Sequence, residues 1–192
     1  MKLPTEPTVV VLASGRGERF FASGGCTHKL QALLAGKPVL EHTLDAVRAS
    51  GIPWHLEGGD HAGMGDAIAA AVRATPHSTG WLVLPGDLPL IQSSTILAIA
   101  AALNNRAVVV PVFEGQRGHP VGFSYECREA LLLLRGNQGA VSVVQGHAAM
   151  ELEVSDIGIV SDIDTIQDLM RAHDFITARE GVDLFSVQKV TI

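Results

Sequence analysis

The sequence predicts an α/β domain whose mostly parallel sheet carries helices on both faces. Short apolar runs rich in valine alternate with amphipathic stretches along the chain. Each apolar run is too short for a helix, which is typical of a strand buried on both faces of a parallel sheet. Strands that alternate with helices in this way favour crossover connections, and these make neighbouring strands parallel.

The length and composition indicate one globular domain. The chain has 192 residues, of which 47% are hydrophobic and 18% are charged. This composition is not that of a disordered chain, and the length suits a single sizeable core. We expect one domain over residues 1–192, with a core at about 8–180 and a C-terminal tail at 181–192.

The first half of the chain contains two strands and two helices by this pattern. Residues 8–13 (TVVVLA) are predicted to form a buried strand. Residues 38–49 are predicted to form a helix, with a proline in its first turn and Gly51 just beyond its end. A short strand at 52–56 and a helix at 66–74, which starts from the glycine-rich turn GMGD, follow.

The second half continues the alternation. Strands are predicted at 81–84 (WLVL) and 107–112, the latter with an irregular end at Pro111, and helices at 93–103, 126–134, 140–145 and 165–178. Ser93 is expected to cap the helix that it opens. Residues 154–160 are expected to bring the chain back towards the sheet. The tail VDLFSVQKVTI has a strand-like composition and is a candidate edge strand or dimer contact.

Several classes of protein are disfavoured. A net charge of −6 argues against nucleic acid as a partner, because surfaces that bind nucleic acid are basic. Cys26 and Cys127 are far apart and form no C-x-x-C pair, which indicates neither a disulfide framework nor a zinc site. The sequence shows no signal peptide and no apolar run near the roughly 20 residues of a membrane span. We expect a cytoplasmic protein with no membrane partner.

The segment LASGRGERF directly follows the first predicted strand. Gly15 and Gly17 let backbone N–H groups approach phosphate oxygens. Three cations can neutralise a triphosphate: Arg16, Arg19 and Lys29. A dinucleotide-binding motif would need a third glycine where Phe20 stands, and a Walker A motif would need G-K-S/T. The alternative is an ordinary glycine turn with solvated arginines.

Acidic residues follow two other predicted strands. Asp87, in LPGDLPLI, could hold Mg²⁺, which usually takes one or two protein carboxylates and leaves its other positions to phosphate and water. The alternative is a turn aspartate that caps the next helix. Asp162 and Asp164 precede the last helix, where Asp164 or Thr165 could simply be its N-cap. Together with the glycine turn, these loops suggest a metal–triphosphate site beyond the carboxyl ends of the strands.

The order of the motifs resembles that of a known family. The matching segments are LASGRGERF with Lys29 and Leu30, GMGDAIAAAV, LPGDLPLI, GQRGHPVGFS, GNQGAVSVV and SDIDTIQDL. The chain resembles the molybdenum cofactor cytidylyltransferase branch of the MobA-like nucleotidyltransferases. The resemblance implies a Rossmann-like, doubly wound nucleotidyltransferase fold. It also implies Mg²⁺-dependent transfer of a nucleoside monophosphate from a nucleoside triphosphate, with CTP favoured, to molybdopterin or another phosphorylated small molecule.

The resemblance also implies roles for individual residues. Catalysis would fall to Lys29, Arg19 and Asp87, and the metal to Asp87 and Asp164, with Asp162 as the competitor of Asp164. The nucleotide would be bound by Leu12, Ala13, Ser14, Gly15, Arg16, Gly17, Lys29, Gly63, Met64 and Gly65. The acceptor would face Arg117, Gly118, His119 and Pro120. In-line attack by an acceptor phosphate needs no protein nucleophile, so His119 is not expected to act as a base.

The chain departs from the family pattern at three places. The segment FFASGGCTH lengthens the spacing between Arg19 and Lys29, and the stretch between Trp54 and Gly63 is shortened as though a βα unit had been trimmed. Ser14 replaces a glycine of the guanylyltransferase branch and would crowd a purine, which favours CTP. Two alternatives stay open. One is a sugar phosphate or other acceptor with a different nucleotide, and the other is a non-catalytic nucleotide-binding protein of molybdoenzyme maturation, with a molybdoenzyme as partner.

Overall fold

A computed structural model describes residues 6–187 of the chain, and the side chains of residues 6–179. A seven-stranded sheet forms its centre. In spatial order, the strands are β4 (Trp54–Glu57), β1 (Thr8–Leu12), β5 (Gly80–Pro85), β8 (Val121–Ser124), β6 (Val108–Phe113) and β7 (Gln116–Arg117), and β9 (Met150–Glu153) also pairs with β6. β1 is parallel to β4 and β5, and β9 to β6, whereas β8 is antiparallel to both of its neighbours.

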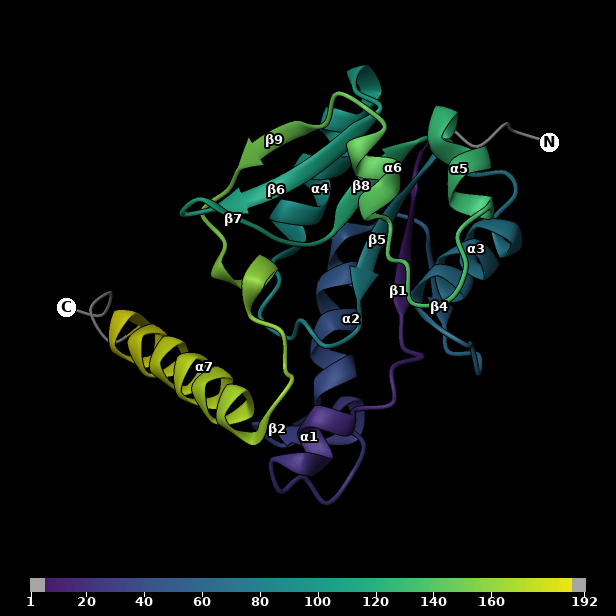
Figure 1. Cartoon of the computed structure of the whole chain (residues 1–192). Coiled ribbons are helices and arrows are strands. Elements are labelled where there is room, and N and C mark those ends of the chain that lie inside the picture. The colour runs from purple at the N-terminus through teal and green to yellow at the C-terminus, as the bar shows by residue number, and fades with distance from the viewer. Residues whose placement is uncertain (1–5, 188–192) are drawn as a thin grey trace.

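Helices cover both faces of the sheet (Figure 1). One face is covered by α3 (Met64–Ala74), α5 (Arg128–Leu132) and α6 (Val141–Gln145), and the other by α2 (Val39–Ser50) and α4 (Ser93–Ala102). Successive residues of a strand point to opposite faces. Val10 therefore packs in the cluster with α3, while Val9 and Val11 pack in the cluster with α2. This two-sided burial explains the continuous valine run and confirms the predicted doubly wound architecture.

A third apolar cluster lies beside the carboxyl end of β1. It joins α1 (Glu18–Ala22), the hairpin of β2 (Leu33–Leu34) and β3 (Lys37–Pro38), and the first turns of α7 (Ile166–Val187). Phe20 and Leu34 are at most 1% exposed in this cluster. Figure 1 shows α7 extending away from the sheet. No helix within residues 6–187 is both long and apolar enough to cross a membrane.

Four short 3-10 helices complete the described residues, 6–187. They are η1 (Lys29–Gln31), η2 (Leu103–Asn105), η3 (Tyr125–Cys127) and η4 (Ile157–Val160). The segment 154–160 does bring the chain back towards the sheet, since the Val154 N–H donates to the Val112 carbonyl at 2.9 Å and Ile159 packs in the cluster on the α2 face. The strand that pairs with β6 is β9, however, and residues 157–160 form η4. The strand β8 was not predicted. Its antiparallel course between β5 and β6 makes the sheet mixed.

Three smaller expectations need correction. Pro111 does not end its strand irregularly: β6 continues to Phe113, and Pro111 pairs with Leu152. Ser93 is the first helical residue rather than the cap, because Asp156 accepts hydrogen bonds from the Gln92 N–H and the Thr95 hydroxyl at that end. The strand expected in the tail is wrong up to Val187, where α7 ends. The last residues of the tail, 188–192, lie outside the described part.

Candidate functional site

The carboxyl ends of β1 and β5 open onto a cleft of about 1020 Å³. Ligands of open α/β sheets bind at this edge. The cleft is lined by residues 14–19 with Lys29, by the loop 61–64, by the segment 116–119, by Asn137 and by the acidic residues Asp87, Asp162 and Asp164, among others. Segments far apart in the sequence therefore meet in one cavity.

The turn after β1 has a backbone that favours glycine. Gly17 has a φ of 66°, in the left-handed region, and α1 begins at the next residue. At Gly15, no heavy atom lies within 4 Å of the position that a Cβ would take. Arg16 Nη1 lies 3.9 Å from Glu18 Oε1, but both side chains are at least 75% exposed. This ion pair is therefore weak and leaves the guanidinium available to bind a ligand.

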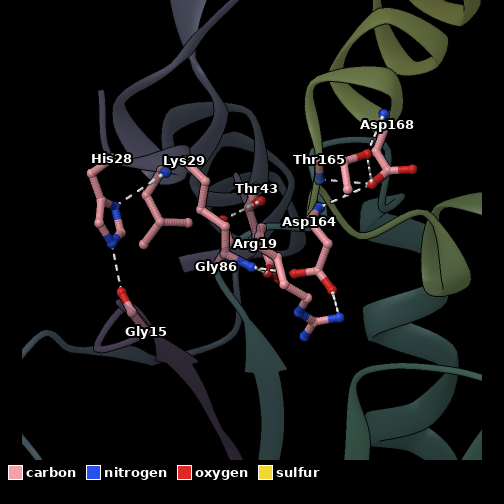
Figure 2. Close-up of polar contacts among 11 residues, drawn as sticks. Gly15, Arg19, His28, Lys29, Thr43, Gly86, Asp164, Thr165 and Asp168 are labelled. Carbon is pink, nitrogen blue, oxygen red and sulfur yellow. Dashed lines mark hydrogen bonds and ion pairs between the residues drawn. The ribbon is translucent and has the colours of Figure 1, made fainter. Parts of the chain in front are cut away.

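Lys29 joins the two acidic loops. Its Nζ lies 2.5 Å from Asp87 Oδ2 and 2.8 Å from Asp164 Oδ1, and all three side chains are less than 20% exposed. Arg19 pairs with the other oxygen of Asp164 (Figure 2). Burial lowers the pKa of Lys29, but the charge of Asp87 and the hydrogen bonds to both carboxylates outweigh it and raise the pKa. The ammonium group is therefore charged and fixed in place.

Backbone contacts hold Asp87 at the end of β5. The Gly86 N–H donates to the Leu12 carbonyl at 2.9 Å, and the Gly86 carbonyl accepts from the buried Thr43 hydroxyl at 3.0 Å. The Ile163 N–H donates to the Asp87 carbonyl at 2.9 Å, which ties the second acidic loop to the first. Of the two carboxylate oxygens of Asp87, only Oδ2 is paired with Lys29. Its Oδ1 is buried and has no hydrogen-bond partner.

Thr165 and Asp168 form a capping box at the start of α7, so Asp164 does not serve as the N-cap of this helix. Asp168 accepts from the Thr165 N–H at 2.8 Å, and the Thr165 hydroxyl accepts from the Asp168 N–H at 3.2 Å. Thr165 is thus the N-cap, and the Asp164 carboxylate points to Lys29 and Arg19 instead. Partial burial and the neighbouring charges of Asp87 and Asp164 raise the pKa of Asp162.

These carboxylates fit a cation that arrives with phosphate groups. Within residues 6–187, no group of three or more His, Cys, Asp or Glu side chains is arranged to hold a metal ion alone. Mg²⁺ needs only one or two carboxylates when phosphate oxygens and water supply the rest. The unpartnered Oδ1 of Asp87 is an oxygen of this kind.

Glycines shape the opposite rim of the cleft. A Cβ on Gly63 would lie 2.3 Å from the backbone of Gly136, and one on Gly65 would lie 2.6 Å from the Gln138 carbonyl oxygen. The Gly65 N–H also donates to the Gly136 carbonyl at 2.8 Å. The loop GMG therefore packs against the loop 135–138, and this contact brings Asn137 to the cleft.

The segment expected to face the acceptor is held by β9 and η4. The guanidinium of Arg117 pairs with Glu151 at 2.6 Å, and the His119 N–H donates to the Ile159 carbonyl at 3.0 Å. Burial lowers the pKa of His119, and this outweighs a hydrogen bond with the Val83 backbone and the charge of Asp87. His119 is thus a neutral ring whose buried Nδ1 has no partner.

Most of the residues singled out from the sequence line this one cleft. They are Leu12, Ser14, Gly15, Arg16, Gly17, Arg19, Lys29, Gly63, Met64, Asp87, Arg117, Gly118, His119, Asp162 and Asp164. Ala13, Gly65 and Pro120 are not among the lining residues; the Ala13 N–H instead donates to the Glu57 carbonyl at 2.8 Å. His61, Gln116 and Asn137 were not predicted. Asn137 lies in GNQGAVSVV, one of the matching motifs, which was the available signal.

Sequence comparison finds a matching domain family and relatives that are longer than this chain. The MobA-like NTP transferase domain matches residues 45–152, more than half of the chain. The bifunctional protein GlmU of Xanthomonas oryzae pv. oryzae is 30% identical in an alignment 154 residues long, which covers 68% of this chain and 32% of that protein. The chain thus spans about a third of the length of such relatives.

Solved structures share the fold. Rv0371c from Mycobacterium tuberculosis H37Rv has a TM-score of 0.73 at 24% identity, over 88% of this chain and 99% of that one, and its complex with manganese has also been solved. Molybdopterin-guanine dinucleotide biosynthesis protein A from Archaeoglobus fulgidus has a TM-score of 0.65 at 16% identity, over 89% and 99%. 2-C-methyl-D-erythritol 4-phosphate cytidylyltransferase from Thermus thermophilus has a TM-score of 0.66 at 19% identity, over 90% and 100%.

The sequence match over residues 45–152 includes Asp87, the loop 63–65 and the segment 117–120. On these grounds, the chain belongs to the MobA-like NTP transferase family.

Proposed function

We propose that this protein is a nucleotidyltransferase, which moves a nucleoside monophosphate from a nucleoside triphosphate to a phosphorylated small molecule and releases pyrophosphate. The observation that carries the proposal is the position of Lys29, fixed between Asp87 and Asp164 in the cleft that the glycine turn borders. A charged group that is already in place needs no reorganisation to stabilise the negative charge that develops in a transition state.

The chain's own residues would bind and orient the two phosphorylated substrates. The backbone of the glycine turn and the exposed guanidinium of Arg16 would hold the triphosphate. An acceptor phosphate is already an anion. Its oxygen attacks the α-phosphorus while the bond to the leaving pyrophosphate breaks, so no side chain has to remove a proton. Lys29 and Arg19 would neutralise the charge of the phosphates.

A divalent cation fits this scheme, with Mg²⁺ as our choice. Asp87 would hold it through Oδ1, the buried oxygen without a partner. Asp164 would be the second residue to contact the cation. Because both of its oxygens are paired with Lys29 or Arg19, Asp162 remains the alternative second ligand. When bound, the cation would draw charge from the phosphate oxygens and orient them.

Within this class, we favour CTP as the donor and molybdopterin as the acceptor. Ser14 lines the cleft and narrows it more than a glycine would, which favours a pyrimidine over a purine. A cytidylyltransferase shares this fold, which supports CTP as the donor. A molybdopterin-guanine dinucleotide biosynthesis protein shares it too, which supports molybdopterin as the acceptor. A sugar phosphate or related acceptor, with another nucleotide, is the alternative. The cytidylyltransferase of similar fold is named for such a phosphorylated polyol.

Pyrophosphate release tests the proposal. The protein is incubated with Mg²⁺ and each of the four nucleoside triphosphates, with molybdopterin, with a panel of sugar phosphates, and without acceptor. Turnover that needs both CTP and molybdopterin supports the favoured substrates, and turnover with another pair supports the alternative. Nucleotide binding without turnover under any condition would contradict the enzyme proposal and favour the accessory protein of molybdoenzyme maturation.

A further inference from the structure

His28, which precedes Lys29, binds two parts of the site without lining the cleft itself. Its Nε2 lies 2.5 Å from the Gly15 carbonyl oxygen (Figure 2). Its Nδ1 accepts a hydrogen bond from the Leu30 N–H, with 3.3 Å between the two nitrogens. His28 ends the segment FFASGGCTH, which lengthens the chain between Arg19 and Lys29. The chemistry proposed above gives this segment no role.

The two hydrogen bonds define the protonation of the imidazole ring. The Leu30 N–H can only donate, so Nδ1 must offer it a lone pair. The proton of the neutral ring is then on Nε2, and it is donated to the Gly15 carbonyl. A ring protonated on both nitrogens could keep the bond to the Gly15 carbonyl but could not accept the bond from the Leu30 N–H.

The bond to Gly15 sets the direction of the next peptide group. The Gly15 carbonyl and the Arg16 N–H belong to one planar trans peptide, so they point in opposite directions. The bond to His28 therefore fixes the orientation of the Gly15–Arg16 peptide, and with it the direction of the Arg16 N–H, in a turn that lines the cleft. A backbone N–H held in one direction can bind a phosphate oxygen without first being reoriented.

The bond to Leu30 fixes the other half of the site. His28 is the N-cap of η1, the 3-10 helix whose first residue is Lys29. The glycine turn also packs here, because a Cβ on Gly17 would lie 3.6 Å from both His28 Cδ2 and Lys29 Cγ. One ring therefore holds the glycine turn and the lysine in a fixed relation.

We propose that His28 is a positioning residue, which pre-organises the glycine turn and Lys29 for the triphosphate of the nucleotide. This inference rests on the proposed function. The segment FFASGGCTH would then place the His28 ring where it bonds both the glycine turn and η1, the helix that begins with Lys29.

Three variants of His28 test the inference. His28→Ala loses both bonds, His28→Asn keeps an acceptor near the place of Nδ1, and His28→Gln keeps a donor near the place of Nε2. His42→Ala is the matched control, because its ring nitrogen also bonds a backbone carbonyl, that of Leu34 at 2.7 Å, but touches neither Gly15 nor η1. The measurements are the Kd of magnesium tripolyphosphate and of each magnesium nucleotide by calorimetry, the KM of the acceptor, and Tm.

We expect His28→Ala to weaken tripolyphosphate and nucleotide binding about tenfold, as the loss of one well-placed hydrogen bond implies. His28→Gln should recover most of this loss and His28→Asn little of it, with the acceptor KM unchanged in all three. His42→Ala should bind as the wild type does. Wild-type affinity in His28→Ala, an equal loss in His42→Ala, or an equal rise in the acceptor KM would overturn the inference.

The binding readout separates this inference from the proposed function. A wild-type protein that binds tripolyphosphate but turns over no nucleotide would contradict the enzyme proposal, and the His28 variants would still be compared by affinity. Normal turnover together with unchanged affinities in the His28 variants would contradict the role of His28 alone.

Discussion

Lys29 Nζ lies 2.5 Å from Asp87 Oδ2 and thereby connects the 3-10 helix η1 to the loop that follows β5. Asp164 completes the contact from the start of α7, and Arg19 pairs with it. Two cations thus balance the two carboxylates in this cluster. A triphosphate that arrived without a counterion would meet little net positive charge there, so we expect nucleotide and divalent cation to bind together.

Removing the lysine tests the energetics of this cluster. Lys29→Met leaves two carboxylates facing each other, and we expect it to lower the free energy of unfolding by about 3 kcal/mol, the low end for broken buried pairs because the side chains are partly exposed. Urea denaturation measures the loss. Mg²⁺ should restore part of it, since the freed carboxylates can bind a cation.

The control for that variant is Lys37→Met, which breaks the exposed pair with Asp45. We expect a change of about 0.5 kcal/mol or less, and no effect of Mg²⁺. Equal destabilisation by the two substitutions would mean that the Lys29 cluster is an ordinary surface ion pair.

Two glycines of the cleft should respond differently to substitution by alanine. Gly63→Ala places a Cβ 2.3 Å from the backbone of Gly136, which cannot yield as a flexible side chain does, so we expect a loss of about 1–3 kcal/mol. Gly15→Ala has open space at its Cβ and should leave Tm nearly unchanged. Thermal denaturation distinguishes them, and a stable Gly63→Ala variant would show that the loop 135–138 is not packed there.

The two cysteines should differ in their reaction with iodoacetamide. Burial raises the pKa of Cys127 to about 11, so its thiol is both inaccessible and protonated. Cys26 is exposed in the segment before His28. Mass spectrometry at pH 8 should find one label, at Cys26, and none in the Cys26→Ser variant. Rapid labelling of Cys127 in the folded protein would contradict the described packing of η3.

The sequence predicted β1, β5 and β6 because these strands are buried on both faces and therefore read as unbroken apolar runs. β8 escaped prediction since VGFS is short, carries a glycine and follows a proline. β9, MELE, alternates exposed and half-buried residues at the border of the sheet, so it lacks the apolar run that marked the other strands. Elements whose pairing is set by tertiary contacts give a weak local signal.

The same distinction holds in the site. Asp87 was predicted because it follows a strand at the edge of the sheet where loops converge. Asp164 follows η4 rather than a strand, and its role was implied by the motif SDIDTIQDL. The role of Lys29 as a bridge between them depends on the course of residues 20–28, which no local pattern gives. The bonds of His28 to Gly15 and Leu30 were missed for the same reason.

The most direct test of the central claim is pyrophosphate release by the Asp87→Asn variant with Mg²⁺ and the preferred substrates. Asp45→Asn is the matched control, since it removes the same charge from the exposed side of α2. We predict that Asp87→Asn lowers kcat at least about 100-fold while the fold persists, and that Asp45→Asn keeps wild-type activity. Near-normal turnover by a folded Asp87→Asn protein would contradict the account.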